Sequence, residues 1–79
     1  MSDKEIVDKL IEIFNTLKHS DIKELDLNSN VITDLGLDSV GLVYMSVMIE
    51  QIFNIDMGDV TFDTFKKVED VVKFIKGKL

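Results

Sequence analysis

The chain has 79 residues, of which 46% are hydrophobic and 30% charged, a composition typical of a folded globular protein. It contains no cysteine, which excludes disulfides, thiolate metal sites and cysteine nucleophiles. No apolar run follows Met1, and no stretch approaches the roughly 20 apolar residues of a membrane span. We therefore expect one soluble, cytoplasmic domain spanning residues 1–79.

The net charge of −6 is distributed unevenly along the chain. Residues 20–59 hold eight acidic residues and one lysine, for −7, whereas residues 60–79 hold three acidic residues and five lysines, for +2. An acidic middle repels phosphates and argues against a nucleic-acid partner. The charge either steers the domain toward basic protein surfaces or keeps it in solution, and composition leaves both open.

An amphipathic helix is predicted from Asp3 to His19. Its apolar residues recur every three or four positions along one face: Ile6, Val7, Leu10, Ile13, Phe14 and Leu17. Ser2 or Asp3 can cap its start, and Lys18 and His19 are favourable near its negative end.

Residues 20–37 predict a long loop. Turn-forming residues interrupt any helical pattern: Asp21, Asp26, Asn28, Ser29, Asn30, Asp34 and Gly36. Apolar residues nevertheless recur through it: Leu25, Leu27, Val31, Ile32, Leu35 and Leu37. We expect the loop to be pinned onto the core, and a loop of this length in a small domain is often functional.

The second half of the chain predicts two further main helices and a short one. Val40–Phe53 follows Asp38, whose carboxylate is a good N-cap. Ile55–Asp63 is compatible with a single helical turn, anchored by Met57, Val60 and Phe62. Val68–Lys76 has one apolar face, and Gly77 suits its end; the face comprises Val68, Val71, Val72, Ile75 and Leu79. The predicted fold is all-α, a small four-helix bundle of three main helices and one short helix, with the long loop between helices 1 and 2.

The positions of the polar residues argue against two kinds of site, a calcium loop and a hydrolase active site. Asp26, Asn28 and Asn30 alternate as in a calcium loop, but Val31 and Leu37 replace the glycine and the glutamate that the loop requires. We expect these polar residues to form turns, and we expect no metal site.

A hydrolase active site is the second kind of site that the sequence does not support. Ser39 as a nucleophile would need a base, and the only histidine, His19, lies at the far end of the first helix. Paired acids and a glycine-rich phosphate loop are both missing from the sequence, so we do not expect an enzyme.

Ser39 begins a helix directly after Asp38, at the end of the long loop. Its hydroxyl is expected near the surface at the positive end of a helix dipole, where a phosphate ester is well tolerated. Asp38 could help to hold a metal ion during phosphoryl transfer by another enzyme. From these residues alone an ordinary helix-start role remains the commoner explanation.

The stretch DLGLDSVGLVYMSVMIEQIFNIDM, residues 34–57, resembles the phosphopantetheine-attachment region of acyl carrier proteins, whose pattern is D-L-G-x-D-S-(L/V). The motif is matched by Asp34, Leu35, Gly36, Asp38, Ser39 and Val40, and the downstream part by Glu50, Phe53, Ile55 and Met57. The end of the chain resembles the closing helix of that family through Phe65, Val68, Asp70, Val71 and Ile75.

The resemblance implies that Ser39 carries 4′-phosphopantetheine, transferred from coenzyme A by a phosphopantetheinyl transferase (holo-carrier synthase). The thiol of the arm would hold acyl intermediates as thioesters. The domain, a monomer, would shuttle them between acyl-transfer, condensing or ligase enzymes of fatty-acid, polyketide or related lipid biosynthesis. Met45 and Met48 would suit an adaptable interior, although a plain core role is the commoner explanation for such methionines.

Two alternatives stay open. One is an aminoacyl or peptidyl carrier, against which Asp38 before the serine is a slight argument. The other is an acidic helical interaction module that is not modified.

The predicted second helix departs from the acyl carrier pattern. Gly41 stands where an Asp is usual; Tyr44, Gln51 and Ile52 stand where Glu is usual; Glu50 remains. We interpret this as a specialised rather than a housekeeping carrier, with drift of surface positions as the alternative. The expected partner-binding residues are Asp38, Val40, Val43, Tyr44, Val47 and Glu50. Lys66 and Lys67 replace the usual Thr or Ser cap of the last helix, which leaves its start open.

Overall fold

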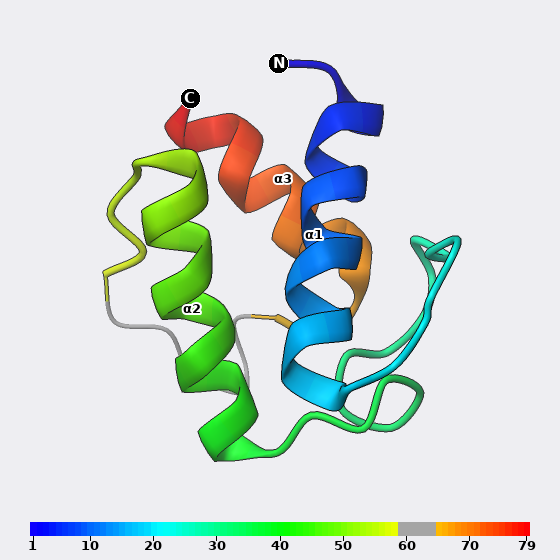
Figure 1. Ribbon diagram of the computed structural model, residues 1–79. Helices are drawn as coiled ribbons and strands as arrows, with labels where there is room; N and C mark the ends of the chain where they lie inside the picture. Colours follow the sequence, from blue (N-terminus) through cyan, green and yellow to red (C-terminus); the bar gives the residue numbers. More distant parts are fainter. Residues whose placement is uncertain (59–64) are drawn as a thin grey trace.

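The computed structural model describes residues 1–58 and 65–79, and within these ranges the chain forms three α-helices. They are α1 (Asp3–Lys18), α2 (Ser39–Phe53) and α3 (Val68–Lys78). Helix α1 packs against both of the others, and the long loop leads from its end to the start of α2 (Figure 1). The predicted all-α class and the three main helices are confirmed.

Helix α1 begins with a reciprocal cap. The Glu5 backbone N–H donates to Ser2 Oγ over 3.2 Å, and the Ser2 backbone N–H donates to Glu5 Oε1 over 3.3 Å. Each bond satisfies a backbone donor that the first helical turn leaves without a partner. The bond from the Ser2 N–H also stabilises the charged carboxylate, which lowers the pKa of Glu5 below its ordinary value.

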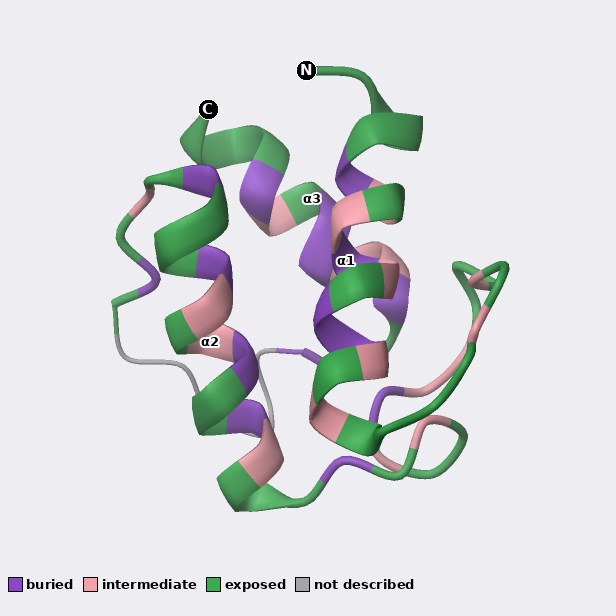
Figure 2. Cartoon of the chain, viewed as in Figure 1, coloured by how far each residue is buried: buried purple, intermediate pink, exposed green. Residues whose placement is uncertain are grey.

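One hydrophobic core lies between the helices and draws on the loop as well (Figure 2). Helix α1 buries Ile6, Leu10, Ile13 and Phe14, helix α2 buries Leu42, Met45, Ile49 and Phe53, and helix α3 buries Val68, Val71, Val72 and Ile75. Val31 and Leu37 of the loop are buried with them, as is Met57 after α2. The predicted pinning of the loop onto the core is therefore confirmed.

Backbone hydrogen bonds tie the loop to the start of α3. The N–H groups of Val68 and Glu69 donate to the carbonyls of Ser29 and Leu27, each over 3.0 Å. The Val31 N–H donates to Lys66 O over 2.9 Å. Loop carbonyls thus satisfy the first donors of α3, a role that a Ser or Thr cap usually has.

This arrangement settles where the last helix begins. Lys67 occupies the N-cap position with extended backbone, and the Asp70 carboxylate accepts the N–H groups of Lys66 and Lys67 over 3.2 and 3.0 Å. Helix α3 therefore starts at Val68, as the sequence predicts, without a hydroxyl cap.

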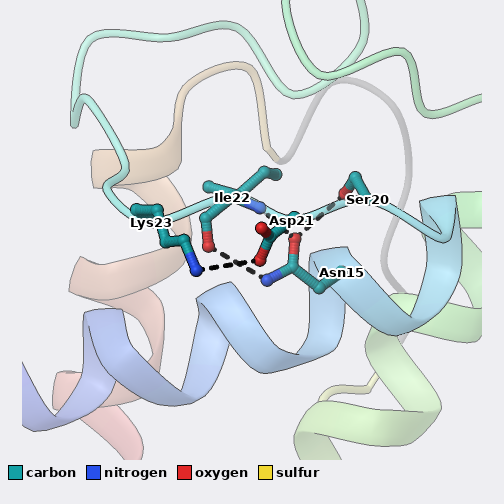
Figure 3. A network of polar contacts seen from close by, with 5 residues as sticks. All are labelled: Asn15, Ser20, Asp21, Ile22 and Lys23. Atoms are coloured by element: carbon teal, nitrogen blue, oxygen red, sulfur yellow. Dashed lines mark hydrogen bonds and ion pairs between the residues drawn. The ribbon is translucent and has the colours of Figure 1, made fainter.

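The other end of the loop is held by Asn15 on α1 (Figure 3). Its Oδ1 accepts the Ile22 N–H over 2.7 Å and the Ser20 hydroxyl over 3.0 Å, and its Nδ2 donates to Ile22 O over 3.0 Å. The nearby ion pair of Lys23 with Asp21, 3.1 Å long, is largely exposed to solvent and adds little to stability. The Asn15 side chain thus holds the backbone at the point where the loop leaves α1.

Several sequence expectations need correction. The short helix predicted within 55–63 is not confirmed: residues 55–58 are not helical, and residues 59–63, with Val60 and Phe62, lie outside the described residues. Gly77 does not end the last helix, which continues to Lys78. Leu27, expected among the residues that pin the loop onto the core, is 41% exposed, and Leu79, expected on the apolar face of the last helix, is 55% exposed. No helix in the described ranges is long and apolar enough to cross a membrane.

Candidate functional site

Ser39 is the first residue of α2 and is exposed. A compact series of turns over residues 31–35 precedes it. The turns close through bonds from the Gly36 and Leu37 N–H groups to the carbonyls of Ile32 and Val31, over 3.0 and 3.1 Å. Gly36 adopts φ +75°, a backbone conformation that residues other than glycine rarely take. The next residue, Leu37, is only 3% exposed. The buried leucine anchors the chain two residues before the serine.

Asp38 is the N-cap of α2, as the sequence predicts. Its Oδ1 accepts the Gly41 N–H over 2.7 Å, and its carbonyl accepts the Leu42 N–H over 2.9 Å. The carboxylate is therefore committed to the first turn of the helix, one residue before Ser39. A capping side chain of this kind stabilises a helix by about 1 kcal/mol.

Gly41 lies close beneath this cap. A β-carbon at this position would lie 3.2 Å from Leu37 Cδ2 and 3.3 Å from Asp38 Oδ1. Both distances are tighter than ordinary van der Waals contact. The glycine that departs from the family pattern thus fits a locally crowded helix start.

The outward face of α2 is apolar over much of its length. Val40, Val43, Tyr44 and Val47 are 58%, 62%, 58% and 46% exposed. Isolated apolar side chains on a surface are ordinary, but four on one helix form a contiguous patch of the kind that marks interfaces. The structure therefore presents all four of these predicted residues on the surface.

Glu50, the remaining acid of the predicted partner-binding set, also has a structural contact. Its Oε1 accepts the Met57 N–H over 3.3 Å, which ties the segment after α2 back onto that helix. The side chain stays exposed. A substitution at Glu50 would thus alter both surface charge and local structure.

The polar residues of the rejected calcium loop are turn residues. Asp26 Oδ1 accepts the Asn28 N–H over 2.8 Å, and Asn30 Oδ1 accepts the N–H groups of Ile32 and Thr33 over 2.8 and 2.9 Å. Within residues 1–58 and 65–79, no three His, Asp or Glu side chains gather in an arrangement suited to a metal ion. The predicted turn role is confirmed.

His19 forms the C-cap of α1 in the left-handed conformation, with φ 51°, and is exposed. Its backbone N–H donates to Asn15 O, which closes the helix end. The predicted helix-end role of the only histidine is thus confirmed.

Lys18, at the end of α1, reaches the segment before Ser39. Its ammonium donates to Gly36 O over 3.1 Å. This bond joins the end of one helix to the approach of the next, and an open hollow of about 220 Å³ lies alongside it. Spacing along the sequence could not reveal this contact, because the two residues lie 18 positions apart.

Comparisons with known proteins agree with this geometry. A family model described as "Phosphopantetheine attachment site" matches residues 8–75. The acyl carrier protein of Phytoplasma australiense is 36% identical, over 85% of this chain and 97% of its own. That of Coprothermobacter proteolyticus is 30% identical, over 100% of this chain and 96% of its own.

A solved structure supports the fold. The apo doublet acyl carrier protein from prodigiosin biosynthesis, a solution structure, superposes with a TM-score of 0.76 at 22% identity. The superposition covers 99% of this chain and 38% of that one.

The chain belongs to the phosphopantetheine-attachment family of acyl carrier proteins. Acyl carrier proteins are carriers rather than enzymes, and their attachment domain carries a covalently bound 4′-phosphopantetheine. The predicted family, cofactor and non-enzymatic class are confirmed.

Proposed function

We propose that Ser39 is the attachment residue for 4′-phosphopantetheine and that the chain carries acyl intermediates on this arm as thioesters. One observation carries the proposal: Ser39 is an exposed first residue of α2, directly after the capping Asp38 and two residues after the buried Leu37, inside the region that the family model matches. The other serines lie outside the D-S motif.

The residues at the site fit the group chemically. Ser39 offers a hydroxyl as the nucleophile, and the first turn of a helix favours a phosphate because of its dipole. Attachment joins Ser39 Oγ to the phosphorus that bears pantetheine and breaks the pyrophosphate bond of coenzyme A. Adenosine 3′,5′-bisphosphate leaves, and the hydroxyl proton passes to the transferase or to solvent. The arm then supplies the thiol that this cysteine-free chain lacks.

The cargo we propose is an acyl group of fatty-acid, polyketide or related lipid biosynthesis. The acidic residue before the serine and the names of the curated relatives support an acyl rather than an aminoacyl cargo. Loading by an acyl–carrier ligase, compared with loading by an aminoacyl-activating enzyme, separates the two.

Attachment is tested by incubating the chain with coenzyme A, Mg²⁺ and a promiscuous phosphopantetheinyl transferase, followed by intact mass measurement. Ser39→Ala is compared with Ser46→Ala, a second serine of α2 whose hydroxyl donates to Leu42 O within its helix. The wild type and Ser46→Ala should gain one arm, and Ser39→Ala should gain none. If no variant gains mass while a known carrier in the same tube is modified, the chain is an unmodified interaction module.

We further propose that the apolar face of α2 binds a condensing or acyl-transfer enzyme. The complementary surface on that enzyme would be an apolar patch with a basic rim. The exposed residues Val40, Val43, Tyr44 and Val47 supply the apolar contact, and Asp38 and Glu50 supply charge at its two ends. The net −7 of residues 20–59 complements a basic rim.

The consequence is a specialised carrier. It should bind a housekeeping ketosynthase more weakly than an acidic carrier does, and the double substitution Tyr44→Glu with Ile52→Glu should strengthen that binding. Both side chains are exposed, so the substitution adds charge without removing core. Equal binding by the wild type and an acidic carrier would show that the altered positions are surface drift.

A further inference from the structure

The open hollow of about 220 Å³ lies between the end of α1 and the start of α2. Leu17 and Lys18 line it from α1, and Val40, Gly41 and Tyr44 line it from α2. Residues on both sides of Ser39 in the sequence, including Asp38 and Val40, contribute to its walls. A group attached to Ser39 therefore starts at the edge of this hollow.

The walls divide into an apolar part and one cation. Leu17 is half-buried, while Val40 and Tyr44 are each 58% exposed and so retain apolar surface that a ligand could cover. The Lys18 ammonium is held beside the approach to Ser39 by its bond of 3.1 Å to Gly36 O. It is the only cationic residue among those that line the hollow.

We propose that the hollow receives the first part of the phosphopantetheine arm, with the Lys18 ammonium paired to the phosphodiester and with Val40 and Tyr44 covering the geminal methyl groups that follow it. This inference rests on the proposed attachment to Ser39. Lys18 is a positioning residue for the arm, and the hollow is its resting place on the free carrier.

Size limits how much of the arm is held. Pockets that enclose a drug-sized ligand are about 300–1,000 Å³. A hollow of about 220 Å³ accommodates only the proximal part, so the thiol end stays free to reach partner enzymes.

Charge and tethering decide whether the contact forms. Asp38 also lines the hollow, and its negative carboxylate would repel a phosphodiester. Its Oδ1, however, already accepts a hydrogen bond from the Gly41 N–H. An exposed ion pair is weak in water. The arm, however, is covalently tethered at the edge of the hollow, so the contact does not carry the translational and rotational cost of bringing two separate molecules together.

The test uses isotope-labelled holo protein with an unlabelled arm, after intact mass has shown the arm on every variant. Filtered nuclear Overhauser spectra report contacts from the arm methyl groups to the Tyr44 ring, which is easily assigned because the chain has one tyrosine. The variants are Lys18→Gln, Lys18→Arg as the rescue, and Lys4→Gln as a matched charge change on the same helix.

The wild type, Lys4→Gln and Lys18→Arg should show these contacts, and Lys18→Gln should lose at least half of their intensity. If Lys18→Gln does not fold, ionic strength replaces it: raising the salt from about 0.01 M to about 1 M shortens the Debye length from about 30 to about 3 Å and should weaken the contacts in the wild type. An arm that is attached but makes no contact with Tyr44, or whose contacts are unaffected by Lys18→Gln or by salt, overturns this inference alone. Failure of attachment overturns the proposed function and this inference with it.

Discussion

Asn15 and Asp38 each close a helix end with one short polar side chain. Asp38 bonds within its own helix, three residues along, so its role as a cap can be predicted from the sequence. Asn15 bonds to Ile22, seven residues along and beyond the left-handed His19, so its role depends on a chain reversal that sequence spacing does not encode. Local bonds could be predicted at this scale, and bonds across a turn could not.

Asn15→Ala should destabilise the protein by about 1–3 kcal/mol, because the half-buried N–H and C=O of Ile22 both lose their partner. Asn15→Asp should fall between alanine and the wild type, since it keeps the acceptor but not the donor. Urea unfolding measures both. Thr16→Ala removes an exposed bond on the same helix and should change the free energy of unfolding by less than about 0.5 kcal/mol; an equal effect of Asn15→Ala and Thr16→Ala would contradict this role.

Asp38 has two separable roles, a structural cap and a proposed contact during attachment. Asp38→Ala should cost about 0.5–2 kcal/mol of stability, whereas Asp38→Asn should retain most of the cap. If the charge of Asp38 assists attachment, Asp38→Asn should be modified more slowly than the wild type despite similar stability. Urea unfolding and the time course of mass increase check the two separately, and an unchanged rate in Asp38→Asn would limit Asp38 to capping.

At the scale of elements, each main helix could be located from its apolar period and its terminal residues. The boundaries agree within two residues, and the largest difference is at α3, which continues past Gly77. What could not be predicted is which groups cap α3, because its first N–H donors, of Val68 and Glu69, bond to the carbonyls of Ser29 and Leu27 in a loop 39 and 42 residues earlier. The local sequence around Lys66 and Lys67 does not indicate these hydrogen bonds.

The two helical glycines should respond oppositely to alanine. Apart from its chain neighbours and the backbone of its own helix, no atom of residues 1–58 and 65–79 lies within 4 Å of a β-carbon at Gly77, so Gly77→Ala should gain up to about 1 kcal/mol of helix stability, less near the helix end. At Gly41 a β-carbon meets the buried Leu37 at 3.2 Å and the capping Asp38 at 3.3 Å, so the same gain is offset and Gly41→Ala should lose stability. Thermal unfolding compares the pair, and equal gains would show that the α2 start can relax.

The reciprocal cap of Ser2 and Glu5 at the start of α1 makes the free energy of unfolding depend on pH in a known direction. The pKa of Glu5 is lowered in the folded chain, mainly by the hydrogen bond from the Ser2 backbone. Its contribution is therefore fully present above its ordinary value of 4.5 and is lost as the pH falls through the lower folded value. Glu5→Gln should remove this part of the acid dependence, measured by urea unfolding from neutral to acidic pH. Glu12→Gln, on the same helix outside the cap, is the control; the same loss in both variants would contradict the assignment to the cap.

At the scale of the whole molecule, one core joins the three helices and the loop, and the site lies where α1, the loop and α2 meet. Hydrophobic periodicity predicted which helical residues build the core, since that signal is local. The exposed Leu27 and Leu79 were not predicted, because exposure at a loop turn or a helix end depends on how the other elements pack. The same holds for Lys18, whose position beside Gly36, three residues before Ser39, arises only from the packing of α1 against the loop.

The central claim is attachment at Ser39, and mapping the arm to a residue tests it most directly. Trypsin cuts after lysine, and one peptide, residues 24–66, contains Ser29, Ser39 and Ser46 together. Fragment-ion mass spectrometry of this peptide from transferase-treated protein should place the phosphopantetheine on Ser39, with unmodified fragments on either side. An arm found on Ser29 or Ser46, or a wholly unmodified peptide beside a fully modified control carrier, would contradict the account.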